Sequence, residues 1–195
     1  LADENEFLFI VDEVQTGVGT TGKMWGVEHM GVTPDIIAFG KKAQICGIIA
    51  GQRLDEVPDN VFHVSSRINS TWGGNLVDMV RSQRYLEIIE EDGLVENAAK
   101  MGQLLLDGMT QIAAQSDLIE NVRGRGMFLA FDLPDPRARH LFRGLLWENG
   151  LIALKSGTRS IRFRPMLDLS AETTEEALAV VEDTLYDARA DGGQL

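Results

Sequence analysis

The stretch FLFIVDE at residues 7–13 decides the fold class of this chain. Five consecutive apolar residues end abruptly in two carboxylates, Asp12 and Glu13. A short apolar run predicts a buried strand of a parallel sheet, and acids at its C-terminal end would lie at the sheet edge where α/β proteins bind ligands. A second run, PDIIAFGK at residues 34–41, predicts another strand that leads directly to Lys41. We therefore expect an α/β protein with a ligand site at this edge.

Asp12 and Lys41 would together suit one cofactor, pyridoxal phosphate (PLP). PLP needs a lysine to bind its aldehyde and a carboxylate to keep its ring nitrogen protonated. Lys41 would also be the general base and acid of the proton transfer. Two alternatives stay open. Asp12 could instead cap the following turn, and Lys42 rivals Lys41 because adjacent residues at a strand end point in opposite directions.

The composition of the chain limits its function class. The 195 residues are 44% hydrophobic and 25% charged, which is typical of a globular protein. The net charge of −12 makes nucleic acid and anionic membranes poor partners. No apolar run approaches the roughly 18 residues of a membrane helix, and the histidines lack metal-ligand spacing, so we expect no metal site. The single cysteine, Cys46, fits a reducing compartment, and we expect a cytoplasmic protein.

Three motifs taken together resemble the class III (ornithine/GABA-type) PLP aminotransferases. They are DEVQTG at residues 12–17, PDI at 34–36 with a lysine at 41, and STWGGN at 70–75. Their order and spacing match over roughly the whole chain. Within that family, FGKKAQICG at 39–47 and SRINSTW at 66–72 are most similar to the L-lysine 6-aminotransferase branch.

The resemblance implies the PLP-dependent transferase fold type I, in three parts. Residues 1–75 would be the C-terminal part of the PLP-binding large domain, 76–115 linking helices, and 116–195 a small C-terminal α/β domain. The family's phosphate-binding loop and the aromatic residue that stacks on PLP lie upstream of the 7–13 strand. We therefore interpret the chain as the C-terminal part of a longer protein and expect this piece alone to bind PLP poorly and to be inactive.

The reaction implied by the resemblance moves the ε-amino group of L-lysine to PLP and then to 2-oxoglutarate. Its products would be 2-aminoadipate 6-semialdehyde, which cyclises, and L-glutamate. The partners are therefore small molecules. An ornithine or GABA aminotransferase of the same family stays open as the alternative.

The resemblance also implies roles around the cofactor. Asp12 matches the carboxylate at the ring nitrogen and Lys41 the catalytic lysine. Val14 would pack against the ring face, and Gln15 would hydrogen-bond near the ring hydroxyl. Thr71 matches a threonine that reaches the phosphate of PLP in the neighbouring subunit, which implies a homodimer.

Two further residues match positions that handle substrate. Asn69 would contact the substrate, and Arg162 matches an arginine of the small domain that binds a substrate carboxylate. A guanidinium suits this task because it donates two parallel charge-assisted hydrogen bonds. Arg164 is a rival, since residues two apart on a strand share a face.

The glycine-rich segment GVGTTGK at residues 17–23 departs from the family and has a second interpretation. The family has Gly-Arg-Thr-Gly where this chain has GTTG at 19–22, and AQIC at 43–46 replaces a glycine cluster. The segment also fits a P-loop, which would indicate an NTPase. However, Met24 replaces the hydroxyl residue that binds Mg²⁺, and the acidic strand leads straight into the loop. An NTPase is therefore only a remote alternative.

The remaining elements follow from periodicity and turn signals. The expected strands are 46–51, 127–133, 151–154 and 160–164, and the expected helices are one from about Leu76 to Gly93, a second through Met109, one over 137–149, and a last one starting at a Thr173…Glu176 capping box.

Overall fold

The computed structural model describes residues 1–68 and 71–190, which form two compact units. The first consists of Leu1–Gly19 and Lys23–Leu94, and the second of Thr20–Gly22 and the chain from Val95 onward. Both units combine helices with a sheet, so the expected α/β class is confirmed.

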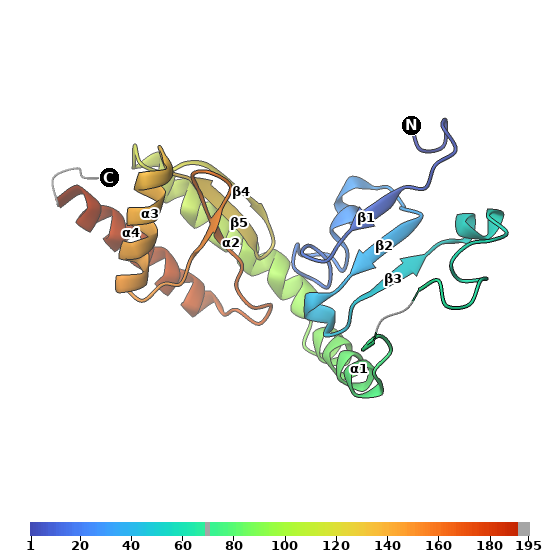
Figure 1. The fold of residues 1–195 in the computed structure, drawn as a ribbon. Helices are drawn as coiled ribbons and strands as arrows, with labels where there is room; N and C mark the ends of the chain where they lie inside the picture. Colours follow the sequence, from blue (N-terminus) through green and yellow to red (C-terminus); the bar gives the residue numbers. More distant parts are fainter. Residues whose placement is uncertain (69–70, 191–195) are drawn as a thin grey trace. The chain divides into compact units, whose positions relative to one another are not determined.

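The first unit contains a three-stranded sheet in the order β1-β2-β3 (Figure 1). Strands β1 (Ile10–Asp12) and β2 (Ile36–Phe39) are parallel, and β3 (Gly47–Ala50) pairs antiparallel to β2. The other elements of this unit are the 3₁₀ helices η1 (Gly26–Met30), η2 (Lys41–Ala43) and η3 (Gln52–Glu56), and the α-helix α1 (Leu76–Glu91).

The prediction that residues 7–13 form a buried strand is wrong in length and in burial. Strand β1 has only three residues, and Phe7 and Ile10 are 52% and 57% exposed. The physical reason is that β1 pairs with β2 alone, so its other edge has no neighbour among the described residues. The free Cys46 is exposed.

The second unit is built on an antiparallel sheet in the order β4-β5-β7-β6. Its strands are β4 (Glu120–Arg125), β5 (Phe128–Asp132), β6 (Leu154–Ser156) and β7 (Ser160–Phe163), and its helices are α2 (Leu94–Ala114), α3 (Pro136–Glu148) and α4 (Ala171–Ala190).

One face of this sheet forms the core of the second unit. Leu129 and Phe131 of β5 lie opposite Phe163 and Ile161 of β7, and all four are buried. Alternate residues of a strand share a face, so these side chains point to the same side of the sheet. They pack with buried residues of all three helices: Leu105, Met109, Ile112, Ala138, Phe142, Leu146, Val181 and Leu185.

Several element boundaries differ from the predicted ones. Strand β4 was not predicted, β6 occupies 154–156 instead of 151–154, and α2 continues past Met109 to Ala114. Helix α4 begins before the predicted capping box, because the hydroxyl of Ser170 accepts a hydrogen bond from the backbone N–H of Thr173 at 3.0 Å. The serine hydroxyl supplies the N-terminal cap in place of Thr173.

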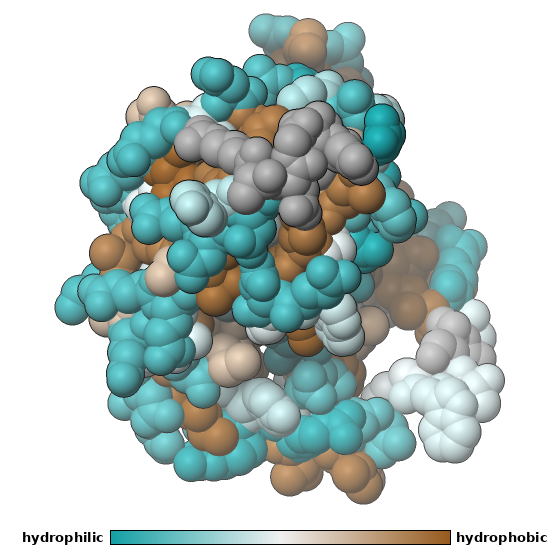
Figure 2. Space-filling model, turned by 90° about the vertical axis from the view of Figure 1, so that its left-hand side faces the viewer, coloured by the Kyte–Doolittle hydropathy of each residue, from teal (hydrophilic) through white to brown (hydrophobic). Residues whose placement is uncertain are grey.

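The surface is mixed in character. In the view of Figure 2, hydrophilic side chains predominate and hydrophobic ones are visible between them. No helix within the described ranges is both long and apolar enough to cross a membrane.

Candidate active site

The parallel pairing of β1 and β2 brings the two chemically important strand ends to one edge of the first sheet. Asp12 is in register with Ala38, and the N–H of Glu13 donates to the carbonyl of Ala38 at 2.8 Å. Strand β2 ends at Phe39, and Lys41 follows two residues later. The predicted acid is thus the last residue of one strand and the lysine follows its parallel neighbour, at the same edge of the sheet.

Asp12 is exposed, and its two carboxylate oxygens differ in their contacts. Oδ1 accepts a hydrogen bond from the N–H of Val14 at 3.0 Å. None of the described residues donates a hydrogen bond to Oδ2. The turn-capping interpretation is therefore realised through one oxygen, and it leaves the other able to meet a ligand.

Lys41 and Lys42 have different surroundings. The amine of Lys42 donates to the carbonyl of Gln15 at 3.4 Å, so this side chain is hydrogen-bonded to the turn after β1. Lys41 is exposed, and its φ of 51° lies in the left-handed region. A non-glycine residue held in that region costs about 1–3 kcal/mol, and such residues cluster at functional sites. These contacts favour Lys41 as the reactive lysine.

The backbone before Lys41 is tightly surrounded. A Cβ on Gly40 would lie 3.0 Å from Sγ of Cys46 and 3.8 Å from Cγ1 of Val14. Val14 therefore lies beside the chain that leads into Lys41, although 27 residues separate them. Val14 and Gln15 are both half-buried in this turn.

Glu13, next to Asp12, has an environment that the sequence reasoning missed. Its side chain is 1% exposed and accepts hydrogen bonds from Thr16, Gly26 and Val27. The only sequence signal is the alternation of a strand, which turns Glu13 away from the side that Asp12 faces. The three donors could not be read from the sequence, because two of them belong to η1.

The other predicted residues of the first unit lie after η3. Thr71 is exposed, in a turn that precedes α1, and Asn75 caps that helix by accepting from the N–H of Val77 at 2.9 Å. Asn69, the predicted substrate contact, lies outside the described residues.

Arg162 lies in the second unit, in the middle of β7 between the buried residues Ile161 and Phe163. Strand alternation places its side chain on the sheet face opposite the core. Its Nε is buried and has no hydrogen-bond partner among the described residues. A buried, unpaired donor is costly, so this atom fits an anionic ligand. Arg164 follows the end of β7 and already has an interaction of its own.

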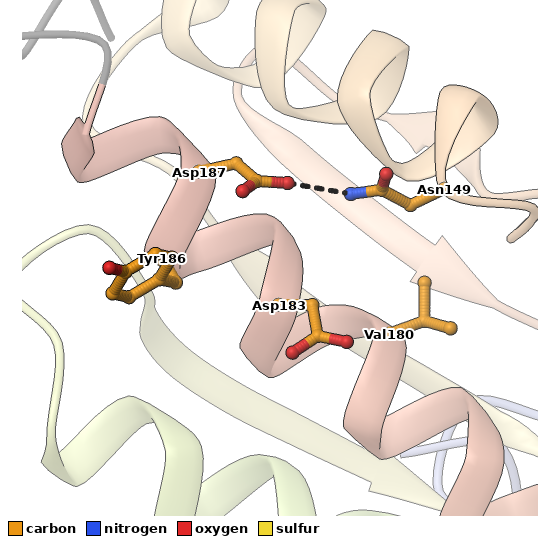
Figure 3. Close-up of a pocket in the computed structure, with 5 residues that line it drawn as sticks. All are labelled: Asn149, Val180, Asp183, Tyr186 and Asp187. Carbon is orange, nitrogen blue, oxygen red and sulfur yellow. Dashed lines mark hydrogen bonds between the residues drawn. The ribbon is translucent and has the colours of Figure 1, made fainter.

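A separate hollow in the second unit holds none of the predicted site residues. It is lined by Asn149, after α3, and by Val180, Asp183, Tyr186 and Asp187 of α4 (Figure 3). Asn149 Nδ2 donates to Asp187 Oδ2 at 3.3 Å across this hollow. Within the described ranges, no group of three or more His, Cys, Asp or Glu side chains could hold a metal ion.

The structure contradicts the P-loop interpretation of residues 17–23. A P-loop leads directly into an α-helix whose N-terminus binds phosphate. Here the segment continues through turns and bends, and the next helix is only the five-residue η1, which starts at Gly26. Gly17, Val18 and Gly19 are also buried.

The residues present fit PLP in their chemistry. An acid with one uncommitted oxygen ends β1 and an exposed lysine follows β2 at the same sheet edge, and the half-buried Val14 and Gln15 lie in the turn after the acid. This is the pair of groups that PLP requires from a protein.

Comparison with known proteins agrees with this chemistry. The sequence model of the family described as Aminotransferase class-III matches residues 1–185. The L-lysine-epsilon aminotransferase of Streptomyces clavuligerus is 46% identical over 187 residues, covering 95% of this chain and 41% of that protein. The 4-aminobutyrate aminotransferase of Dictyostelium discoideum is 42% identical over 161 residues, covering 81% of this chain and 31% of that protein.

Among solved structures, the lysine aminotransferase of M. tuberculosis matches with a TM-score of 0.91 and 47% identity, covering 95% of this chain and 43% of that chain. The chain thus spans less than half the length of these relatives.

Proposed function

The chain belongs to the class III aminotransferase family, and from this premise we propose that the full-length protein that carries it is a PLP-dependent L-lysine 6-aminotransferase. It would transfer the ε-amino group of L-lysine to 2-oxoglutarate, giving 2-aminoadipate 6-semialdehyde, which cyclises, and L-glutamate. The observation that carries the proposal is the parallel pairing of β1 with β2, which brings Asp12 and Lys41 to one sheet edge. The lysine specificity is supported by relatives named L-lysine-epsilon aminotransferase at 46% and 48% identity.

When bound, PLP would carry the amino group between the two substrates and withdraw electrons from the reacting carbon. Asp12 would hold a proton on the ring nitrogen through its uncommitted Oδ2. Lys41 would bind the cofactor and then move the proton at the reacting carbon, as general base and acid. Val14 would cover one face of the ring, and Gln15 would donate near the ring hydroxyl.

Substrate binding would fall to Asn69 and Arg162. The guanidinium of Arg162 would pair with a substrate carboxylate, and a ligand there would satisfy the buried Nε that has no partner among the described residues. Both L-lysine and 2-oxoglutarate carry a carboxylate, so one arginine can serve both half-reactions.

Thr71 would act across a homodimer interface, on the phosphate of PLP in the partner subunit. Its exposure in the single chain is compatible with this role. Sedimentation of the PLP-loaded full-length protein should show a dimer, and an active monomer would contradict the role of Thr71.

A direct assay tests the proposed reaction. The full-length protein with PLP and 2-oxoglutarate should form L-glutamate when L-lysine is supplied, and more slowly with ornithine or GABA at the same concentration. Glutamate formation that depends on ornithine or GABA but not on L-lysine would instead support the alternative within the family. A Lys41→Ala variant should form none with any donor.

A further inference from the structure

Glu13 follows Asp12 directly but lies in a very different environment. Asp12 is exposed, whereas the Glu13 side chain is only 1% exposed and is among the largest fully buried side chains of the chain. Glutamate is almost never fully buried unless its carboxylate is paired. The burial of this carboxylate must therefore be compensated by hydrogen bonds.

Three donors surround the Glu13 carboxylate. Oε2 accepts from the hydroxyl of Thr16 and from the N–H of Gly26, the latter at 3.0 Å. Oε1 accepts from the N–H of Val27 at 2.6 Å. The last two groups are at the start of η1, where backbone N–H groups have no partner within the helix. The carboxylate thus joins the turn after β1 to η1.

The backbone of Glu13 is fixed as well. Its N–H donates to the carbonyl of Ala38 on β2 at 2.8 Å, and its carbonyl accepts from the N–H of Gly17 at 2.9 Å. Between these two bonds lies Val14, whose N–H holds Oδ1 of Asp12. The bond that orients Asp12 therefore belongs to a turn that Glu13 anchors at both ends.

The surrounding packing leaves this turn little room. A Cβ on Gly17 would lie 2.7 Å from the Trp25 ring and 2.9 Å from the Glu13 carbonyl oxygen. A Cβ on Gly26 would lie 3.1 Å from Oε2 of Glu13. Side-chain contacts and hydrogen bonds thus select the same turn geometry.

We propose that Glu13 is a positioning residue for Asp12: its buried carboxylate fixes the turn of residues 12–17, so that Asp12 presents one orientation to the ring nitrogen of PLP. The proposal rests on the function proposed above. It assigns to Glu13 an effect on the cofactor that acts through Asp12, because Glu13 itself faces away from Asp12 and is closed off by Thr16 and η1.

Glutamine cannot replace this carboxylate. A glutamine amide has one acceptor oxygen and one NH₂ donor. Whichever way it is placed, the NH₂ faces the N–H of Gly26 or of Val27, and that N–H loses its acceptor. A buried donor without a partner is destabilising, so the turn should relax although the side-chain volume is unchanged. Asp12 would then adopt several orientations.

The test uses the full-length protein loaded with PLP and three measurements. The first is the pH midpoint at which the visible absorption band of the cofactor changes, the second is kcat and KM for L-lysine, and the third is thermal unfolding without PLP. Glu13→Gln should move the midpoint by about one pH unit and lower kcat about tenfold, with KM within about twofold. Thr16→Val, which removes one donor, should act in the same direction but less strongly.

Two variants control for indirect effects. Thr16→Ser keeps the hydroxyl, so its midpoint and kcat should equal those of the unaltered protein. Thr110→Val removes a hydroxyl of α2 that donates to the Leu106 carbonyl at 2.7 Å, and it should leave the midpoint unchanged.

The outcomes separate this proposal from the proposed function. If Glu13→Gln and Thr16→Val lower the unfolding temperature but leave the midpoint and kcat unaltered, Glu13 is only structural and the proposal is overturned. If Glu13→Gln does not fold, the midpoint and kcat of the two Thr16 variants decide. A change in Thr16→Val but not in Thr16→Ser supports the proposal, and no change in either variant overturns it. If the unaltered protein shows no visible band with PLP, the proposed function itself fails, and the positioning role fails with it.

Discussion

Neighbouring charged residues at this sheet edge differ sharply in their surroundings. Asp12 is exposed and Glu13 is buried, and the Lys42 amine contacts Gln15 whereas the Lys41 side chain is exposed. The sequence was sufficient to predict that Asp12 and Lys41 share an edge, because apolar runs and strand ends are local signals. It could not reveal which groups surround each side chain, because two of the three donors to Glu13 lie 13 and 14 residues further along the chain.

Arg162 and Arg164 give a prediction at this scale. In the full-length protein, Arg162→Gln should raise KM for both L-lysine and 2-oxoglutarate by about 10- to 100-fold, because a hydrogen bond to a charged group contributes about 1.5–3 kcal/mol. Arg164 already has an interaction of its own. Arg164→Gln should therefore change KM by less than about threefold. Steady-state kinetics of both variants checks this. A larger effect from Arg164→Gln would reverse the assignment.

Asp132 gives a pH-dependent prediction. Burial raises the pKa of Asp132, but hydrogen bonds from Ser160, Asn121 and Arg123 outweigh burial and lower the pKa from 3.8 to about 2. The donor distances are 2.5, 2.9 and 3.0 Å. Because the pKa is lowered in the folded state, Asp132 stabilises the fold fully above about pH 4, by about 2 kcal/mol, and this stability is lost as the pH falls towards 2.

Urea unfolding of the full-length protein at several pH values would measure this contribution. Asp132→Asn should remove the acid-sensitive part of the free energy of unfolding. Asp117→Asn changes an exposed carboxylate that accepts no hydrogen bond from the part of the chain that the structure describes, and its unfolding should follow that of the unaltered protein. Equal pH profiles for both variants would show that Asp132 does not contribute in this way.

Helices and strands were predictable to different degrees. Helix α1 starts at the predicted Leu76, and β5 and β7 lie within the predicted strands 127–133 and 160–164. Strand β4 was missed because its sequence, ENVRGR, is polar and largely exposed. It is a strand because it pairs with β5, which is a long-range interaction with no local signal.

Close packing of α2 against the segment before β5 gives a prediction at the scale of elements. A Cβ on Gly102 would lie 2.2 Å from the backbone carbon and oxygen of Gly126. Because these are backbone atoms, the chain itself would have to shift to make room for a methyl group. Gly102→Ala should therefore destabilise the protein by roughly 2 kcal/mol or more. Gly144 of α3 has open space around its Cβ position, and Gly144→Ala should stabilise by up to about 1 kcal/mol.

The two alanine variants are matched, since both place one methyl group in a helix. Thermal unfolding should show opposite shifts in the midpoint temperature. A Gly102→Ala variant as stable as the unaltered protein would mean that α2 does not approach Gly126 as closely as the structure has it.

At the scale of the whole molecule, the chain spans 41% of the length of its L-lysine-epsilon aminotransferase relatives and has apolar residues exposed on its first unit. Phe7, Ile10, Leu76 and Val77 are each at least half exposed, and large apolar side chains at the surface can bind hydrophobic molecules. The fold class and the family were predictable, because the motifs are local. The exposure of these apolar side chains was not, because burial depends on contacts between segments that are far apart in the sequence.

The 195-residue chain studied alone should therefore behave differently from the full-length protein. We expect it to bind a hydrophobic dye such as ANS and to show neither a visible PLP band nor aminotransferase activity. Fluorescence and absorption of both proteins at equal concentration would check this. A PLP band of full intensity in the 195-residue chain would contradict the expectation.

The most direct test mixes the PLP-loaded full-length protein with L-lysine in the absence of any keto acid and follows the yellow absorption band. L-lysine should bleach the band in the unaltered protein and in Lys42→Ala, and Lys41→Ala should never show it. Bleaching by ornithine or GABA alone would contradict the lysine specificity while leaving the family intact. An unaltered protein that never shows the band would contradict the PLP function itself.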